Sequence, residues 1–484
     1  MVSHTSTLLT DLYELTMMQG FFAQGNHNKT AIFDVFYRNN PHKNGYAIFA
    51  GLEQFLDYLS NLKFDDSDIS YLQSLGLFNE EFLLYLRDFK FTGTVYSVVE
   101  GSVIFPAEPI MKIVAPLAQC HLIEGALLNI INYQCLIATK ASRMVTAAAG
   151  DPVVELGLRR AQGQSASLYG ARASIIGGLS LTSNVQAGKM FGLPLTGTHA
   201  HSWVMSFDTE LDAFRSYAKM YTNKCILLVD TYNTLKSGVP NAIKVFDELD
   251  LANKDGTYGI RLDSGDLAYL SKSARQMLDD AGHKKAIIAA TNDLDETLIS
   301  DLRLQGATIN MWGVGTHLIT SGGQPSFGGV YKLAALESND STKLVPKIKI
   351  SEAPEKINNP GNKKIFRLYD SNTKKIKADL IALDHETIDP TKDLTIFHPL
   401  QTWKKMTLRA NQFYVKEMLT KVVDNGTVVY SSPTVAEIQA YANAEKESLW
   451  EEIKRLRRPH LFPVDLSQEL YDLKNKMLNG ESVV

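Results

Sequence analysis

The pattern of apolar and polar positions changes character twice along the chain, and the first stretch covers residues 1–130. A short helix is expected over residues 13–22. The segment AIFDVFYR, which begins at Ala31, alternates like a strand until Pro41 and Gly45 interrupt it. Mixed short elements of this kind predict a small α+β sandwich domain.

From residue 131 to 345, short β-branched runs that end in polar residues alternate with amphipathic helical stretches. The runs are PVVELGLRR from Pro152, LPLTGTHAHS from Leu193, CILLVDTYNT from Cys225, YGIRLDSGD from Tyr258, KAIIAATND from Lys285, INMWGVGTH from Ile309 and GVYKLAAL from Gly329. The run ends recur at intervals close to the roughly 30 residues of a βα unit. About seven strands without a GxGxxG turn favour an α/β barrel over an open dinucleotide-binding sheet.

The pattern breaks again in residues 346–484. KKIFRLYDSNTKKIKADLIAL and LTKVVDNGTVVYSS are typical of hairpins, and the second turns at Asn425-Gly426. Residues 433–458 are expected to form one long helix with a charged, solvated face. We assign this stretch to hairpins and helices that complete the sandwich and add a C-terminal extension.

Composition narrows the class of protein. Apolar residues make up 45% of the 484 positions and charged residues 21%, as in folded soluble proteins. A net charge of −4 without long runs of like charge argues against a nucleic-acid partner. No segment approaches 18 uninterrupted apolar residues and the start lacks a secretory signal, so no membrane partner and a cytoplasmic location are expected. Cys120, Cys135 and Cys225 lack CxxC spacing and are expected to be buried, reduced thiols.

The run YGIRLDSGD places Arg261 and Asp263 on one face, while Leu262 faces the other way. In a βα barrel, side chains at the carboxyl ends of the strands converge on one mouth. A guanidinium suits an anionic substrate, and a carboxylate suits a metal ion or a ribose hydroxyl. The competing interpretation is a buried Arg-Asp pair followed by a helix that Ser264 or Asp266 caps.

Glycine-rich backbone follows a late run of the barrel. Gly313, Gly315 and Thr316, then the glycines of residues 322–329 with Lys332 behind them, are typical of a phosphate site in a late barrel loop. Plain turns are the alternative. The chain has no GxxxxGK[ST] motif, so a nucleoside triphosphate has to be held without a P-loop.

Two further run ends carry paired polar groups. His199 and His201 are open to three interpretations: zinc ligands lacking an evident third partner, core or loop histidines, or a nucleophile or base beside a carboxylate. Arg159 and Arg160 follow a strand that contains Glu155. One of these arginines suits a surface salt bridge and the other a pyrophosphate group.

Eight strings in order carry a family resemblance. They are TDLYELTMMQGFF, FDVFYRNNP, ELGLRRAQG, SNVQAGKMFGLPLTGTHAHSWVMSF, VDTYNTLKSGVPNAI, GIRLDSGDL, GVGTHL and PSFGGVYKL. Together they resemble nicotinate phosphoribosyltransferases of the bacterial type. The resemblance runs from about residue 8 to 370 and continues weakly near the end.

The resemblance implies a reaction and a fold. Nicotinate and 5-phosphoribosyl 1-diphosphate become nicotinate mononucleotide and diphosphate, coupled to hydrolysis of the co-substrate ATP, in salvage synthesis of NAD. The implied fold is the type II phosphoribosyltransferase kind, an irregular α/β barrel with an open α+β sandwich. A homodimer with active sites at its interface and Mg²⁺ as cofactor are also implied.

The same resemblance implies roles for individual residues. Tyr13, Thr198 and Arg261 resemble the nicotinate-binding residues, Thr316 resembles a phosphoribosyl diphosphate contact, and His201, which precedes Ser in the string AHS, resembles the histidine that ATP phosphorylates.

The chemistry of the residues agrees with these roles. Nicotinate is a flat ring with a carboxylate, which suits Tyr13 and Arg261. Cleavage at the anomeric carbon builds positive charge that Asp230 and Asp263 can stabilise, with Asp263 the candidate Mg²⁺ ligand. The predicted catalytic residues are His201, Asp263 and Asp230, and the predicted phosphoribosyl diphosphate contacts are Thr316, Gly315, Gly313, Arg159 and Lys332.

Three other functions stay open at this point. A nicotinamide phosphoribosyltransferase differs in preferring the amide to the acid. A metal-dependent barrel hydrolase with His199 and His201 as ligands requires bound zinc. A non-catalytic protein binds phosphoribosyl diphosphate without releasing diphosphate.

Overall fold

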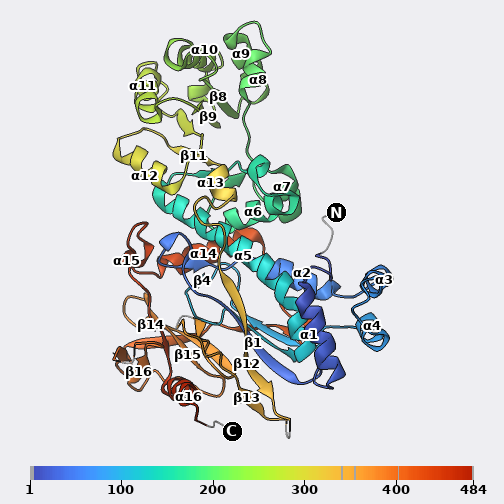
Figure 1. The fold of residues 1–484 in the computed structure, drawn as a ribbon. Helices are drawn as coiled ribbons and strands as arrows, with labels where there is room; N and C mark the ends of the chain where they lie inside the picture. The colour runs from blue at the N-terminus through green and yellow to red at the C-terminus, as the bar shows by residue number, and fades with distance from the viewer. Residues whose placement is uncertain (1–4, 340–341, 354–355, 402, 482–484) are drawn as a thin grey trace. The chain divides into compact units, whose positions relative to one another are not determined.

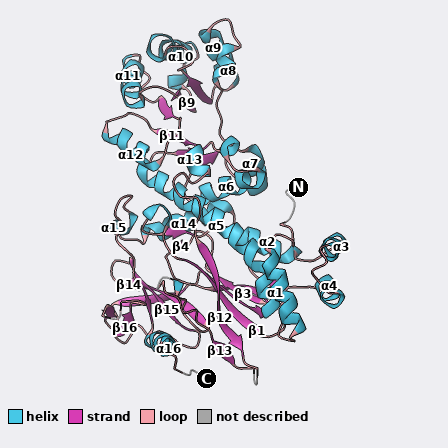
Figure 2. Ribbon diagram, viewed as in Figure 1, coloured by secondary structure: helices cyan, strands magenta, loops and turns pink. Residues whose placement is uncertain are grey.

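The computed structural model describes residues 5–339, 342–353, 356–401 and 403–481, and its chain divides into two compact units of mixed α/β structure (Figures 1 and 2). The sandwich unit comprises Met1–Leu136, Ser326–Pro433 and Ala440–Val484. The barrel unit comprises Ile137–Pro325 and Thr434–Gln439.

The barrel unit is built on six parallel strands in the order β7-β6-β11-β10-β9-β8. The strands are β6 (Val153–Glu155), β7 (Leu181–Thr182), β8 (Lys224–Leu228), β9 (Thr257–Leu262), β10 (Ile287–Ala290) and β11 (Met311–Val314). Leu181 of β7 and Ile226 of β8 come from the two ends of this order, yet both line one cavity with residues of the other four strands. The sheet therefore curls on itself, and the expected irregular α/β barrel is confirmed.

Helices follow the strands, as the βα spacing predicts. They are α6 (Gln164–Ile176), α7 (Val185–Phe191), α8 (His201–Met205), α9 (Glu210–Met220), α10 (Val239–Glu248), α11 (Leu267–Asp280), α12 (Glu296–Leu304) and α13 (Thr316–Ile319), with a short 3-10 turn η2 (Leu158–Arg160) after β6 and a π turn η3 (Thr234–Gly238) before α10.

One predicted barrel strand, LPLTGTHAHS, is wrong. Only Leu195 makes a parallel bridge, to Thr182, and the chain then runs as a loop to α8. A side chain replaces strand pairing at this point, because the Nε2 atom of His199 accepts the backbone N–H of Leu228 in β8 at 3.2 Å. The histidine pair accordingly does not lie on a strand.

The run GVYKLAAL is a strand, but its predicted place in the barrel is also wrong. It forms β12 (Gly329–Glu337) and pairs antiparallel with β1 (Thr30–Tyr37) in the sandwich unit. The predicted barrel range of 131–345 thus ends too late, since the units divide at residues 325 and 326. Alternation predicts a strand but not the sheet that the strand joins, which depends on pairing over some 300 residues of chain.

The sandwich unit has two larger sheets. The first has the order β13-β12-β1-β5-β3-β19-β20 with antiparallel pairs throughout, and the second has the order β17-β16-β21-β15-β14-β18. Their remaining strands are β3 (Thr94–Ser97), β5 (Met111–Pro116), β13 (Leu344–Pro346), β14 (Lys363–Asp370), β15 (Ile376–Leu383), β16 (Leu394–Phe397), β17 (Lys405–Leu408), β18 (Phe413–Glu417), β19 (Thr420–Asp424), β20 (Thr427–Val428) and β21 (Val464–Leu466), and a small pair joins β2 (Ala47–Ile48) to β4 (Val103–Ile104).

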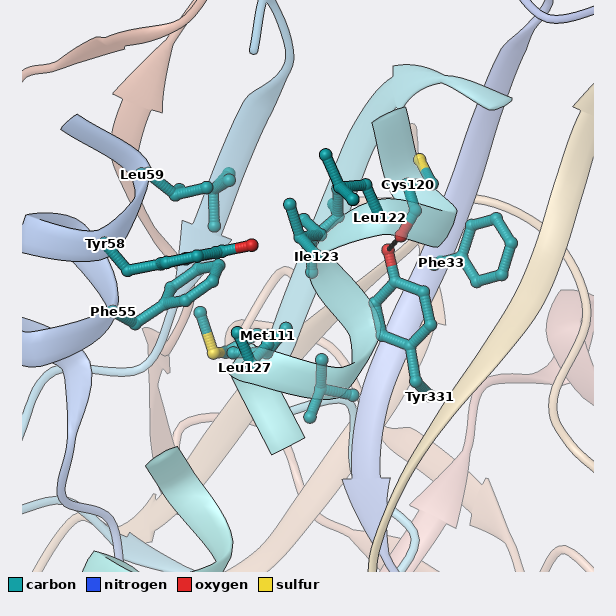
Figure 3. Packing of buried hydrophobic residues seen from close by; sticks show 14 of the residues in the cluster. Phe33, Phe55, Tyr58, Leu59, Met111, Cys120, Leu122, Ile123, Leu127 and Tyr331 are labelled. Carbon is teal, nitrogen blue, oxygen red and sulfur yellow. Dashed lines mark hydrogen bonds between the residues drawn. The ribbon is translucent and has the colours of Figure 1, made fainter. Parts of the chain in front are cut away.

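Helices cover the first sheet and close a large apolar core. They include α1 (Leu12–Ala23), α2 (Leu52–Asn61), α3 (Asp66–Ser74), α4 (Glu80–Arg87) and the long α5 (Leu117–Ala148). Figure 3 shows Tyr58 of α2 and Ile123 of α5 within this core, where the Tyr331 hydroxyl donates to the Cys120 carbonyl at 3.0 Å. Aromatic stacking of Tyr331 on Phe33, with ring centroids 4.6 Å apart, ties β12 to β1.

Several local predictions are confirmed in this unit. Helix α1 and strand β1 cover the expected segments, and β14 and β15 form the expected hairpin. Asn425 (φ 47°) and Gly426 (φ 78°) both take positive φ between β19 and β20, as a two-residue hairpin turn requires.

The predicted long helix over residues 433–458 is instead two helices. These are α14 (Val435–Glu447) and α15 (Glu451–Lys454), and α16 (Gln468–Leu478) follows further along the chain. The break falls at Ser448–Trp450, where the Trp450 Nε1–H donates to the Ile376 carbonyl at 2.8 Å. This tertiary contact redirects the chain.

Helix α5 is long and apolar enough to cross a membrane by length and composition alone. However, 67% of its most apolar window is buried within the protein, as in the core helix of a folded domain. The three cysteines are buried and free, as expected.

Candidate active site in the barrel

A cavity of about 680 Å³ runs along the inside of the barrel. It extends from Lys224 and Thr257, where β8 and β9 begin, to Thr291, which follows β10. Its polar lining includes two of the predicted site residues, Thr198 and Arg261. A largely apolar cleft with a few convergent polar groups is what a small, flat ligand needs.

Arg261 is the main cationic group of this cavity. The predicted alternation is confirmed, because Leu262 is fully buried while Arg261 reaches the cavity and Asp263 is only partly buried. One guanidinium nitrogen, Nη2, donates to the His199 carbonyl at 3.0 Å, whereas Nε is enclosed without a hydrogen-bond partner. Burial lowers the pKa of Arg261, and the charges of Asp263 and Asp230 oppose this effect. A half-buried guanidinium with an enclosed, unused donor can bind a carboxylate or phosphate.

Asp230, just after β8, is the centre of a hydrogen-bond network at the barrel mouth. Its side chain is only 1% exposed and accepts the Asp263 backbone N–H at 2.9 Å and the Ser264 hydroxyl at 2.6 Å. The other carboxylate oxygen lies 3.2 Å from Nε2 of His201. Asp263 in turn accepts the hydroxyl of Thr291. Consecutive strand ends therefore hold two carboxylates and a histidine in fixed positions.

His201 and His199 lie in different environments, which the sequence could not reveal. His201 begins α8 and is 40% exposed, and its Nε2 contact with Asp230 favours a proton on Nε2 and leaves Nδ1 as the nucleophilic nitrogen. His199 is buried beside Tyr217, and burial lowers its pKa to about 4. A neutral His199 whose Nε2 is occupied by the Leu228 N–H is a structural histidine, so the zinc pair is not supported.

Gly313 is required by packing inside the barrel. A Cβ atom there would lie 2.5 Å from Cγ2 of Thr291 and 2.7 Å from a methyl group of Leu156. Gly313 lines the cavity, and Gly315 connects β11 to Thr316, the first residue of α13. The structure thus confirms where these residues lie, while their contact with phosphoribosyl diphosphate stays a prediction.

The loop after β10 contains no predicted site residue, although the run KAIIAATND ends there. Asn292 (φ 86°) and Asp293 (φ 45°) both adopt left-handed backbone, which is strained for residues other than glycine and is concentrated at functional sites. Asp293 accepts a hydrogen bond from the Thr316 hydroxyl at 3.4 Å. The available signal was the string TND, in which two polar residues follow a buried run.

Glu155 of β6 has no predicted role in the site, yet it is the most deeply buried carboxylate of the barrel mouth. It accepts the Thr182 hydroxyl at 2.5 Å and the backbone N–H of Gly157, and burial raises its pKa. Arg159 follows in η2, exposed, and lies close enough to Arg261 to lower the pKa of that guanidinium. Arg159 and Arg261 therefore both place positive charge in the same region of the barrel.

Asp266, by contrast, has a structural role. Its side chain accepts the backbone N–H of Tyr269 at 2.9 Å and caps α11. The alternative in which Asp266 caps the following helix is confirmed for this residue, and Asp263 remains the carboxylate at the mouth.

Tyr13 and Lys332 both lie in the sandwich unit and not among the residues that line the barrel cavity. Tyr13 is 51% exposed on α1, and the neighbouring carboxylate of Glu14 raises the pKa of the phenol. Lys332 is half-buried on β12, where burial lowers its pKa. The predicted roles of these two residues in substrate binding stay predictions.

Comparison with known proteins identifies the family. The nicotinate phosphoribosyltransferase N-terminal domain matches residues 8–132 and the C-terminal domain of the same enzymes matches residues 362–474. A nicotinate phosphoribosyltransferase of Bacillus subtilis is 47% identical over 97% of this chain and 94% of its own length. That of Caenorhabditis elegans is 35% identical over 96% of this chain and 92% of its own.

Solved structures agree with the sequence comparison. The crystal structure of human nicotinic acid phosphoribosyltransferase, 28% identical, covers 97% of this chain and 100% of its own with a TM-score of 0.84. A nicotinate-nucleotide pyrophosphorylase from Pyrococcus furiosus, 19% identical, covers 93% of this chain and 98% of its own with a TM-score of 0.70 and shares the fold. The expected type II phosphoribosyltransferase fold is confirmed. These comparisons do not favour a nicotinamide phosphoribosyltransferase, a metal-dependent barrel hydrolase or a non-catalytic binding protein. The chain belongs to the nicotinate phosphoribosyltransferase family.

Proposed function

We propose that the barrel transfers the phosphoribosyl group of 5-phosphoribosyl 1-diphosphate to nicotinate, forming nicotinate mononucleotide and diphosphate in NAD salvage. The observation that carries this proposal is the enclosed, unpartnered Nε of Arg261 in the barrel cavity. A nicotinate carboxylate satisfies this donor, and the apolar walls of the cavity accept the pyridine ring. Thr198, also in the lining, can donate a hydroxyl to the same carboxylate.

The carboxylates at the mouth suit the chemistry of the transfer. As the bond between ribose C1 and diphosphate breaks, positive charge develops on the sugar, and Asp230 and Asp263 can stabilise that charge. Hydrogen bonds from Ser264 and Thr291 hold these carboxylates in place, so little reorganisation is needed during the reaction.

The residues present fit Mg²⁺. Asp263 and Asp293 offer carboxylate oxygens, the ligand type that Mg²⁺ prefers, at the ends of adjacent strands β9 and β10. When bound, the ion neutralises charge on the departing diphosphate. Arg159 and Thr316 complete the set of groups that can bind phosphate oxygens.

His201 is the group through which ATP hydrolysis is coupled in this proposal. Its exposure admits the γ-phosphate, and Asp230 holds the imidazole so that Nδ1 attacks while Nε2 keeps its proton. The N–P bond forms as ADP departs, and water later cleaves it to release phosphate. Phosphorylation adds about −1.5 to −2 charges beside Asp230, if it resembles other phosphorylated side chains.

The functional test measures diphosphate formation from phosphoribosyl diphosphate with nicotinate or nicotinamide, with and without ATP. We expect faster release with the acid, further stimulated by ATP. His201→Ala is expected to react at the ATP-independent rate and to incorporate no phosphate from ATP, while His385→Ala, an exposed control, behaves as the wild type. ATP stimulation that survives in His201→Ala would refute the coupling role, and a preference for nicotinamide would refute the substrate assignment.

We further propose a homodimer in which Tyr13 of one copy completes the site of the other. The exposure of Tyr13 on α1 supports this arrangement, since an aromatic ring that stacks on nicotinate must be accessible. Tyr13→Ala and Arg261→Met are each expected to lose most of their activity when assayed alone. Mixing and refolding the two variants should restore up to about a quarter of the activity. About half of the dimers then contain one copy of each variant, and one of the two sites in each such dimer is intact. A monomer by ultracentrifugation, or no recovery on mixing, would contradict the shared site.

A further inference from the structure

Three side chains of the sandwich unit, unused in the proposed reaction, converge where α1 meets α5. They are Glu14 of α1 and His121 and Glu124 of α5. Each offers one ligand atom, and these atoms all lie within 4.8 Å of one another. The chain separates Glu14 from the other two by more than 100 residues, so the sequence alone does not reveal this cluster.

The backbone brings the three residues together for clear reasons. His121 and Glu124 are three residues apart and so share one face of α5. The next residue, Gly125, lets the chain before α1 approach closely, because a Cβ atom there would lie 3.3 Å from the Cα of Thr10. The start of α1 therefore packs directly on α5, with Glu14 one turn further along.

The imidazole of His121 is held by its neighbours. Phe21 lies against it with ring centroids 5.2 Å apart, and Phe33 meets it edge-on at 5.4 Å. Phe33 is the same ring that stacks on Tyr331 in the core shown in Figure 3. Rings fixed by packing in this way give a ligand nitrogen a defined direction.

The carboxylate of Glu14 points to a ligand. Glu14 is 1% exposed, and its Oε2 lies 2.9 Å from Nδ1 of His121. Its second oxygen, Oε1, is enclosed and has no hydrogen-bond partner. Burying an unsatisfied carboxylate oxygen costs free energy, which a bound cation offsets.

We propose that Glu14, His121 and Glu124 bind a divalent transition-metal ion, with zinc as the best match. One imidazole nitrogen and two carboxylate oxygens are ligands that zinc accepts at about 2.0–2.2 Å. A tetrahedral site with such bonds separates its ligand atoms by about 3.4 Å. The ligand atoms lie within 4.8 Å of one another, so the side chains have to draw together when the ion binds. The partly exposed Glu124 leaves the fourth position open to water.

The rival explanation is a set of charge pairs without metal. In that case a protonated His121 balances Glu14. Burial and the neighbouring Glu14 raise the pKa of Glu124 to about 7, so that these two carboxyl groups can also share a proton, while Lys332 opposes this effect. The chain offers a matched control for this explanation, because His385 and Glu469 form a comparable pair at 2.8 Å on the surface of the same unit, with no third ligand among the residues that the structure describes.

The experiment uses the full-length chain, stripped of metal with a chelator and dialysed. Titration with ZnCl₂ alone, followed by calorimetry and elemental analysis, is expected to show one high-affinity Zn²⁺ per chain and a raised Tm. His121→Ala and the near-isosteric Glu124→Gln are expected to weaken that binding at least 100-fold, whereas His385→Ala leaves it unchanged. Bound Co²⁺ should give the visible absorption of a tetrahedral site in the wild type and in His385→Ala, but not in His121→Ala or Glu124→Gln.

Folding of each variant is checked without metal by circular dichroism, and Glu124→Gln keeps the experiment decisive if His121→Ala does not fold. Absence of stoichiometric Zn²⁺ binding in the wild type would overturn the proposal. Equal binding in the wild type and Glu124→Gln would do the same and would favour the charge-pair explanation.

Discussion

Buried Arg367 and half-buried Arg261 show how differently the sandwich unit and the barrel unit treat the same side chain. Arg367 of β14 donates from Nε and Nη2 to Asp379 at 2.9 and 2.7 Å, from Nη1 to Glu445 at 2.6 Å, and from Nη2 to the Val103 carbonyl at 2.8 Å. Arg261 in the barrel donates to one carbonyl, and its Nε has no partner. A guanidinium whose donors all have partners within the protein stabilises the fold, whereas a guanidinium with an unpartnered donor in a cavity is available to a ligand.

The largest expected effect is a loss of stability when Arg367 is replaced. Arg367→Met leaves Asp379 and Glu445 buried without their cation and should lower the free energy of unfolding by about 3–5 kcal/mol. Urea denaturation measures this loss. Arg409→Met, which breaks an exposed pair with Asp393, should cost no more than about 1 kcal/mol. Similar losses in the two variants would show that the buried network of Arg367 stabilises the fold no more than an exposed ion pair.

Arg261, whose Nε has no hydrogen-bond partner, is expected to affect catalytic activity more than stability. Arg261→Met should reduce kcat/KM for nicotinate by about 10²–10³-fold, equivalent to roughly 3–4 kcal/mol of transition-state stabilisation, with little loss of stability. Steady-state kinetics and urea denaturation are measured together, with Arg303→Met, an exposed arginine paired with Asp151, as the control. A variant that unfolds easily but retains its kcat/KM would assign Arg261 a structural role.

A pH dependence of stability is expected in the barrel unit from His199. Its folded pKa of about 4 lies below the usual value near 6.5, so the unfolded chain binds more protons between these values. The stabilisation is complete above about pH 6.5 and is lost as pH falls toward 4, by at most about 3 kcal/mol. His199→Gln, whose Oε1 can take the place of Nε2 and accept the Leu228 N–H but does not titrate, should flatten this part of the profile. Identical profiles for the two proteins would exclude His199 as the cause.

The smallest effect separates two neighbouring carboxylates of the barrel. Asp266→Ala removes the cap of α11 and should cost about 1 kcal/mol of stability while leaving kcat near the wild-type value. Asp263→Ala should instead reduce kcat strongly with little change in stability. Thermal unfolding and steady-state rates test both variants, and a strong fall in kcat in Asp266→Ala would bring that residue into the site.

Much of the fold follows from local patterns. Period-two alternation correctly predicts β1, β9 and the β14–β15 hairpin, and Asn425-Gly426 correctly predicts a turn, because these features depend on neighbouring residues alone. The place of β12 was predicted wrongly, because alternation is the same whichever sheet receives the strand.

Some residues of the candidate site can likewise be predicted from local patterns, whereas the roles of others depend on the tertiary structure. Strand ends in the sequence identify Asp230, Arg261 and Asp263, since parallel strands bring their carboxyl ends to one mouth. The division of roles between His199 and His201 depends on burial and on the contact with β8, which no local pattern encodes.

The sequence by itself determined the alternation of strands and helices in the barrel, the residues at the strand ends and the family. All three depend on short segments and on the order of those segments along the chain. Only the tertiary structure decided which arginine is satisfied, which histidine is buried, and that Glu14 meets His121 and Glu124. The physical reason is that burial and partner choice arise from contacts between distant segments, and these contacts form only when the chain folds.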